Sequence, residues 1–398
     1  MRQISRRAYK AHSYYMEVTD SEFTQRGKPM DQKYRIQNVE TIPSPSLVVY
    51  LAQVQQNIEH AIATVNGDVS KLRPHAKTHK TAEIIAMERD AGILKHKCAT
   101  LREAEMLAQN GIQDILIAYQ MVGPNVNRFV SLQRQYPDAD FKVIVDHQEA
   151  VSALSVEVAK FGLTVKVMLD LDVGMNRTGI PVGDAAVDVY AQIEAAEGLQ
   201  PWGLHVYDGH IHDEDVAERK ASCDESLAQV AEMQDRLAAK GLDVPLIVMG
   251  GTPTFPIYAE TPGVETSPGT FVFHDYGYTT RYPDLGFTPA ALLLSRIISI
   301  PTPHRITLDL GHKAIAADPD GVRGVVLSVD DAEVSMQHEE HWAINVPDST
   351  PMHIGQEIYV CPTHICPCVA LHPFYYLVDT DGYCRGTWEV TARNRTAA

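Results

Sequence analysis

The sequence predicts an α/β protein with a (β/α)8 barrel of the TIM type, followed by a mostly antiparallel second β domain. Three observations indicate this fold. Between residues 46 and 251, short apolar runs alternate with longer amphipathic segments, which is typical of parallel strands joined by crossover helices. No glycine-rich nucleotide turn follows Tyr50, which disfavours a doubly wound sheet. After about residue 287, β-rich runs follow one another without helical segments.

Eight apolar runs provide the strands that a (β/α)8 barrel requires. In chain order they are residues 46–50, 71–77, 96–100, 114–119, 141–146, 164–172, 203–209 and 245–251. Segments such as LREAEMLAQNG, with apolar residues at helical spacing and a closing glycine, lie between them. We therefore assign residues 41–287 to the barrel and residues 288–398 to the β-rich domain, with residues 1–40 packed on the latter.

Composition and charge narrow the functional class. The 398 residues are 45% apolar and 21% charged, as in globular proteins. The net charge of −17 argues against nucleic acids and anionic membranes as partners, because long-range repulsion opposes the encounter. No run approaches the roughly 18 apolar residues of a membrane span, the N-terminus has no secretory pattern, and the six cysteines are few for this length. We expect a cytoplasmic protein with a small-molecule substrate.

Lys77 is the first candidate for the active site. It ends the run KLRPHAK, and the carboxyl ends of barrel strands carry the active site in this fold. The segment is cationic although the protein as a whole is acidic. Neighbouring cations and apolar walls disfavour the ammonium form of a lysine, which is the condition for an imine-forming nucleophile or a base. A solvated basic strand end remains the alternative interpretation of these residues.

Two other strand ends lead into polar turns. The turn GMNRTG follows residues 164–172 and contains Arg177, for which an ion pair with Asp170 or Asp172 is the plain structural interpretation. The segment VMGGTPT ends the last predicted barrel strand, where backbone N–H groups and hydroxyls can form a phosphate cradle. The residues of this predicted cradle are Gly250, Gly251, Thr252 and Thr254.

A metal pair is predicted in the second domain. His364 and Cys366 are two residues apart in PTHICPC, and on an extended segment both side chains would lie on one face and bind one cation. Imidazole and thiolate suit Zn²⁺, whereas Mn²⁺ or Mg²⁺ prefers oxygen ligands. A buried cysteine beside a surface histidine is the alternative.

The motif RPHAKTHK resembles the cofactor-lysine motif of the D-threonine aldolase / D-serine dehydratase family. These are fold-type III pyridoxal 5′-phosphate enzymes with an alanine-racemase-like barrel. The turn GMNRTG, the loop GGTPT and the pair THIC repeat the resemblance in the expected order. It extends over roughly residues 45–393.

The resemblance implies a role for each candidate residue. Lys77 would carry pyridoxal phosphate through an imine, Arg177 would hydrogen-bond its phenolic oxygen, and the GGTPT loop would bind its phosphate. Tyr207 would lie close to the cofactor and its lysine. His364 and Cys366 would hold a divalent ion that meets the β-hydroxyl of the substrate.

His341 is a further candidate by resemblance. The segment QHEEHW is similar to the family's S-E-E-H stretch, in which the histidine contacts the β-hydroxyl or a metal-bound water. The serine position reads Gln337 or His338 here, and this departure leaves the match inexact. A homodimer is also implied, because fold-type III enzymes generally complete their sites across two subunits.

The resemblance predicts a lyase for D-configured β-hydroxy-α-amino acids but leaves its reaction open. The overall similarity favours a D-threonine aldolase, which forms glycine and an aldehyde. The thiolate ligand Cys366 resembles the dehydratases, which convert D-serine or D-3-hydroxyaspartate to a keto acid and ammonia. An amino-acid racemase that uses Tyr375 or Tyr376 as a second base, and a non-catalytic pyridoxal-phosphate-binding protein, are lesser alternatives.

Overall fold

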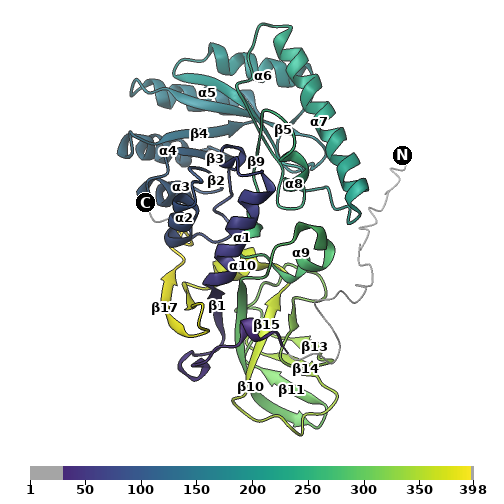
Figure 1. Cartoon of the computed structure of the whole chain (residues 1–398). Coiled ribbons are helices and arrows are strands. Elements are labelled where there is room, and N and C mark those ends of the chain that lie inside the picture. Colours follow the sequence, from purple (N-terminus) through teal and green to yellow (C-terminus); the bar gives the residue numbers. More distant parts are fainter. Residues whose placement is uncertain (1–29, 396–398) are drawn as a thin grey trace, which may run out of the picture.

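The computed structural model describes residues 30–395. Figure 1 shows two parts, a barrel of strands and helices above and a β-rich part below. No helix within the described residues is both long enough and apolar enough to cross a membrane.

The barrel is built from parallel strands, which confirms the predicted fold class. Its strand order is β2-β3-β4-β5-β7-β8-β9, and the short β6 pairs with β5. Isolated parallel bridges from Leu72 to Thr266 and from His75 to Lys97 place the segment that ends in Lys77 between β9 and β2. The strands are β2 (Lys95–Cys98), β3 (Asp114–Gln120), β4 (Asp140–Val145), β5 (Val165–Asp172), β6 (Ile180–Pro181), β7 (Leu199–Val206), β8 (Leu246–Met249) and β9 (Val264–Thr266).

Helices surround the barrel, and most of them follow a barrel strand and bury one face against it. In α3, for example, Thr100 accepts a hydrogen bond from the Glu103 N–H and so caps the helix, while Ala104, Met106 and Leu107 are buried in the core. The helices of this part are α1 (Leu51–Thr64), α2 (Ala82–Asp90), α3 (Leu101–Gln109), α4 (Pro124–Gln135), α5 (Gln148–Ala159), α6 (Asp184–Ala195), α7 (Val216–Ala238) and α8 (Phe255–Tyr258).

One predicted barrel strand was assigned to the wrong sheet. Residues 46–50 form β1 (Ser46–Tyr50), which pairs antiparallel with β10 and parallel with β16 in the β-rich part. All five residues are buried, and an apolar run buried on both faces suits the centre of either sheet, so its pattern could not decide between them. The barrel strand in its place is β9, whose three residues are too few to be recognised as a strand.

The second part is mostly antiparallel, as predicted; the β1–β16 pair is its parallel exception. Its other strands are β10 (Ala291–Thr302), β11 (Arg305–Leu308), β12 (Gly324–Val326), β13 (Glu333–Gln337), β14 (Trp342–Asn345), β15 (Glu357–Pro362), β16 (Phe374–Val378) and β17 (Cys384–Glu389). The helices α9 (Tyr276–Arg281) and α10 (Ile365–Leu371) lie between the two parts in Figure 1.

The segment before β1 also packs on this sheet. Tyr34, Ile36 and Ile42 are buried in one cluster with Tyr50 and Leu292. Residues 1–29, which were expected to pack here as well, lie outside the described residues. The domain boundary at residue 287 stays a prediction.

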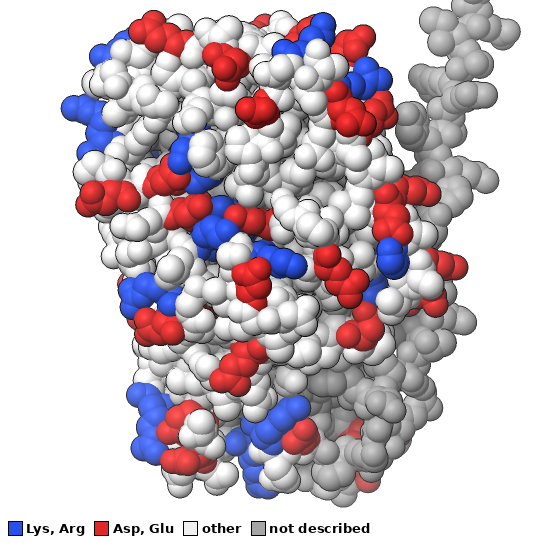
Figure 2. Space-filling view, turned by 45° about the horizontal axis from the view of Figure 1, so that its top comes forward, with Lys and Arg blue, Asp and Glu red and all other residues white. Residues whose placement is uncertain are grey.

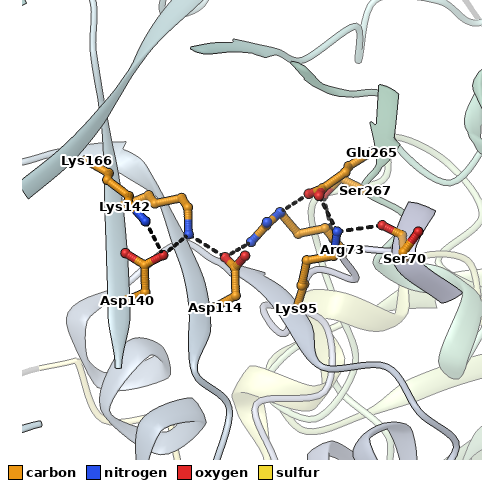
Figure 3. Close-up of polar contacts among 9 residues, drawn as sticks. All are labelled: Ser70, Arg73, Lys95, Asp114, Asp140, Lys142, Lys166, Glu265 and Ser267. Carbon is orange, nitrogen blue, oxygen red and sulfur yellow. Dashed lines mark hydrogen bonds and ion pairs between the residues drawn. The ribbon is translucent and has the colours of Figure 1, made fainter. Parts of the chain in front are cut away.

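A charged network crosses the amino-terminal end of the barrel (Figure 3). Arg73 is fully buried and donates to Asp114 and to Glu265, at 2.6 Å each. Lys142 continues the network by donating to Asp114 at 2.7 Å and to Asp140 at 2.8 Å. Burial raises the pKa of Asp114, but the hydrogen bonds and charges of Arg73 and Lys142 outweigh it and hold that pKa below its ordinary value. Because this end of a TIM-type barrel is the stabilising one, we interpret the network as structural.

We expect Arg73→Met to lower the free energy of unfolding by about 1–3 kcal/mol, because it removes charge-assisted hydrogen bonds to Asp114 and Glu265, which keep only Lys142 and Lys95 as partners. Urea unfolding of the variant and the unaltered protein measures this difference. Arg236→Met is the control, since Arg236 is half-exposed and pairs with Glu232 on the surface. Equal losses in the two variants would contradict a structural role for the buried network.

Candidate active site

Lys77 lies at the carboxyl end of the barrel, where the segment before it crosses between β9 and β2. Its backbone N–H donates to the Nδ1 atom of His75 at 3.3 Å, and its Nζ lies 5.6 Å from the centre of the Tyr207 ring. Tyr207 directly follows β7 and is half-buried. The structure thus brings together two of the predicted residues that lie 130 positions apart in the sequence.

Two more cations face the same ring. The Cζ atom of Arg177 lies 4.7 Å from the centre of Tyr207, and the Nζ atom of Lys97 lies 5.9 Å from it. The alternative ion pair of Arg177 does not form: Asp170 binds His205 instead, and Asp172 accepts backbone N–H groups of its own turn. Arg177 therefore stays available to a ligand at the barrel mouth.

The GGTPT loop borders this group. Gly250 has a φ of +80°, and an added Cβ would lie 2.8 Å from the Thr254 hydroxyl. The Gly251 N–H donates to Thr254 at 3.2 Å, and Thr252 accepts from the N–H groups of residues 269 and 270 at 3.1 Å each. The two hydroxyls fix the loop, while phosphate binding by these residues stays a prediction.

His364 and Cys366 lie next to this site, although not on the extended segment that we predicted. His364 is extended, but α10 begins at Ile365, so the first turn of a helix places Cys366 near the imidazole. The Ile365 N–H donates to the buried carboxylate of Asp275 at 3.1 Å and fixes this turn. The Sγ atom of Cys366 lies 3.2 Å from the hydroxyl of Thr78, the residue after Lys77. The pair is therefore tied to the strand end that carries the lysine.

The chemistry of the pair suits a divalent metal. Burial raises the pKa of Cys366, but His364 and the nearby Lys77 outweigh it, so the pKa lies below its ordinary value and favours thiolate. His364 shares a hydrogen bond through Nδ1 with Asp318, which leaves Nε2 for a metal. Within residues 30–395 no cluster of three or more His, Cys, Asp or Glu could hold an ion. The pair would supply two ligands and leave the remaining positions to solvent or substrate.

Comparison with known proteins decides the family. Residues 49–277 match the family described as alanine racemase, N-terminal domain. The chain belongs to this family. Residues 290–378 match a putative serine dehydratase domain, so the two parts of the alanine-racemase-like fold both have counterparts.

Individual relatives of this family cover nearly the whole chain. The chain is 26% identical to the 3-hydroxy-D-aspartate aldolase of Paracoccus denitrificans (strain Pd 1222), covering 89% of this chain and 93% of the relative. It is 25% identical to the D-threo-3-hydroxyaspartate dehydratase of Delftia sp. (strain HT23), covering 88% of this chain and 97% of the relative. The crystal structure of D-threonine aldolase from Filomicrobium marinum superposes with a TM-score of 0.83 at 27% identity, covering 90% and 98%. The chain is accordingly a pyridoxal-phosphate-dependent lyase with an alanine-racemase-like fold.

The residues at the barrel mouth fit this cofactor. Within residues 30–395, the side chains of Lys77, Lys97 and Arg177 form no ion pair, although the protein carries a net charge of −17. Three unpaired cations around one ring provide the complement of an anionic ligand. Lys77 would supply the primary amine that pyridoxal phosphate requires.

His341 is not brought into this group. It is exposed in the turn between β13 and β14, where its carbonyl accepts from the His338 N–H at 2.8 Å. Its contact with a β-hydroxyl stays a prediction. Sequence reasoning also missed three residues at the site, namely Lys97, Thr78 and Asp318. Lys97 lies near the end of β2, and the strand-end rule that selected Lys77 could have selected it.

We expect Gly250→Ala to weaken cofactor binding about tenfold or more, because the left-handed backbone and the contact with Thr254 force the loop to move. Titration of the apoenzyme with pyridoxal phosphate measures the change. Gly241→Ala is the matched control: Gly241 has a φ of +72° but an added Cβ would meet open space. If both variants bind the cofactor as the unaltered chain does, the loop has no role in retaining it.

Proposed function

We propose that this lyase cleaves D-configured β-hydroxy-α-amino acids of the D-threonine type to glycine and an aldehyde. The observation that carries the proposal is the Thr78–Cys366 contact, which ties the predicted metal pair to the strand end of Lys77. A site for the amino group and a site for the β-hydroxyl would thus be adjacent. The aldolases among the relatives, for 3-hydroxy-D-aspartate and D-threonine, support the same substrate class.

The roles of the residues follow from their positions. Pyridoxal phosphate, when bound, supplies an acceptor for the electron pair of the bond broken at Cα. Lys77 would hold it covalently and exchange protons with the substrate through Nζ. Arg177 would steady negative charge at the phenolic oxygen. His364 and Cys366 would hold a divalent ion, Zn²⁺ by their ligand type, whose Lewis acidity favours loss of the β-hydroxyl proton.

Dehydration is the second candidate, and Cys366 is the observation that favours it. By resemblance, a thiolate ligand is typical of the dehydratases, and the relative from Delftia is a dehydratase for the same class of hydroxyaspartate. Loss of water from the substrate would then give an enamine, and hydrolysis of its imine tautomer by water would release a keto acid and ammonia. Racemisation through Tyr375 fits less well, because Tyr375 is fully buried and packs against Phe273 and Trp388. Tyr376 is half-buried and stays the candidate second base for that reaction.

Incubation of the metal-loaded holoenzyme with D-threonine, D-serine and D-3-hydroxyaspartate tests the proposal. We expect glycine and an aldehyde from D-threonine, and no reaction with L-threonine. Ammonia and keto acids as the products would instead establish the dehydratase. Racemised substrate as the sole product would contradict both lyase reactions.

We also propose a cytoplasmic homodimer acting on small D-amino acids. The family resemblance supports the dimer, and all six cysteines are free in the structure, which suits a reducing compartment. Sedimentation of the holoenzyme at micromolar concentration checks the oligomeric state. A fully active monomer would contradict the homodimer.

A further inference from the structure

Lys97 is a buried cation that the reaction described above does not use. It lies on β2 beside His75 of the segment that leads to Lys77, and only 2% of its surface is exposed. Its Nζ points to the ring of Tyr207 from 5.9 Å, while Lys77 Nζ lies 5.6 Å from the same ring. Lys97 therefore belongs, with Lys77, to the group of side chains around this ring.

Lys97 differs from other buried lysines of the protein, which form ion pairs. Lys142 pairs with Asp114 and Asp140, and Lys80 pairs with Glu103. By contrast, in the part of the chain that the structure describes, the ammonium of Lys97 has neither an ion pair nor a hydrogen-bond partner.

The acidic groups near Lys97 do not compensate its charge. Asp170 accepts a hydrogen bond from His205 at 2.6 Å, and Asp208 is a buried carboxylate that forms no ion pair with Lys97. Burial, followed by the charge of Lys77, lowers the pKa of Lys97 to about 7. A buried amine that must give up its charge, or keep it unpaired, destabilises the fold.

We propose that Lys97 is a ligand-binding residue that contacts an anionic oxygen of the bound cofactor, either of its phosphate or of its phenol. The two Nζ atoms lie 5.6 and 5.9 Å from the centre of the same Tyr207 ring, so a cofactor joined to Lys77 would have Lys97 as a neighbouring cation. The inference rests on the proposed function only in that the cofactor is attached to Lys77. The cost of burying Lys97 would then be offset when the cofactor binds.

Lys97→Met tests this, because methionine preserves the shape of the side chain and removes its charge. We expect the apoenzyme of this variant to bind pyridoxal phosphate about 10–100-fold more weakly, as for the loss of one charge-assisted hydrogen bond. Its thermal midpoint without cofactor should be equal to or above that of the unaltered apoenzyme, since an unpaired buried charge is removed. A second titration with pyridoxal identifies the oxygen: affinity lost only for the phosphorylated form assigns the phosphate, and equal losses assign the phenol.

Lys95→Met is the matched control on the same strand. Lys95 lies at the opposite end of β2 and pairs with Glu265, so its loss should lower the thermal midpoint and leave cofactor affinity unchanged. Wild-type affinity in Lys97→Met, or a midpoint lowered as much as in Lys95→Met, would overturn the inference. Borohydride reduction and peptide mapping of Lys97→Met show separately whether Lys77 still carries the cofactor. Failure of this inference would therefore leave the proposed function intact.

Discussion

Replacement of Lys77 by alanine is expected to remove the covalent cofactor and to reduce turnover at least about 10³-fold, because the variant loses the amine that holds the cofactor and exchanges protons. The side chain reaches the barrel mouth at Tyr207, and Cys366 lies beside the next residue. No other lysine in the described part of the chain has both neighbours. The purified variant should therefore be colourless, whereas the unaltered protein should be yellow.

Lys71→Ala is the control for this variant. Lys71 begins the same segment at the opposite end of the barrel, where its Nζ donates to the carbonyl of Ala259 at 2.7 Å. Its replacement should preserve the visible absorbance and most of the turnover. If Lys77→Ala keeps the absorbance and activity of the unaltered protein, another amine carries the cofactor.

Replacement of Cys366 by alanine is expected to remove the metal and to lower turnover at least about 100-fold while the cofactor stays bound. His364 alone would remain as a protein ligand, and a single imidazole does not retain a divalent ion. Metal analysis, visible absorbance and turnover of the same sample separate the two losses. Chelation of the unaltered protein should reproduce the effect.

Two further variants test whether the effect of Cys366→Ala is specific to a metal ligand at this position. Cys384→Ala removes a half-buried thiol on β17 and should change neither metal content nor turnover. Cys366→Asp should restore metal binding with a preference shifted toward Mn²⁺ or Mg²⁺, since carboxylate is the harder ligand. Full turnover of Cys366→Ala without metal would refute the metal assignment.

Much of the fold could be predicted because alternating strands and helices leave a strong periodic pattern. The error at β1 shows the limit of that pattern. Residues 46–50 read as a buried strand and are one, but burial on both faces is common to the barrel and to the second sheet, so only pairing partners distant in sequence distinguish them. The true last barrel strand, Val264–Thr266, has no pattern to find.

Some residues of the candidate site could be predicted from the local sequence, whereas others could not. Tyr207 directly follows β7, and Lys77 ends a segment that is bridged to β9 and β2 without forming the regular strand that we predicted, so the rule that strand ends face the active site selected both. Arg177, five residues after the end of β5, was predicted by resemblance instead. Thr78 and Asp318 act on residues more than forty positions away, at Cys366 and His364, and local sequence cannot reveal such contacts. The start of α10 after His364 was missed for the same reason, because a carboxylate from Asp275 fixes that turn.

The covalent attachment itself gives the most direct test. Reduction of the holoenzyme with borohydride, digestion and peptide mapping locate the amine that carries the cofactor. The account predicts one pyridoxyl group per chain, on the peptide that contains Lys77. A pyridoxyl group on Lys97 or on a surface lysine instead, or none at all, would contradict it.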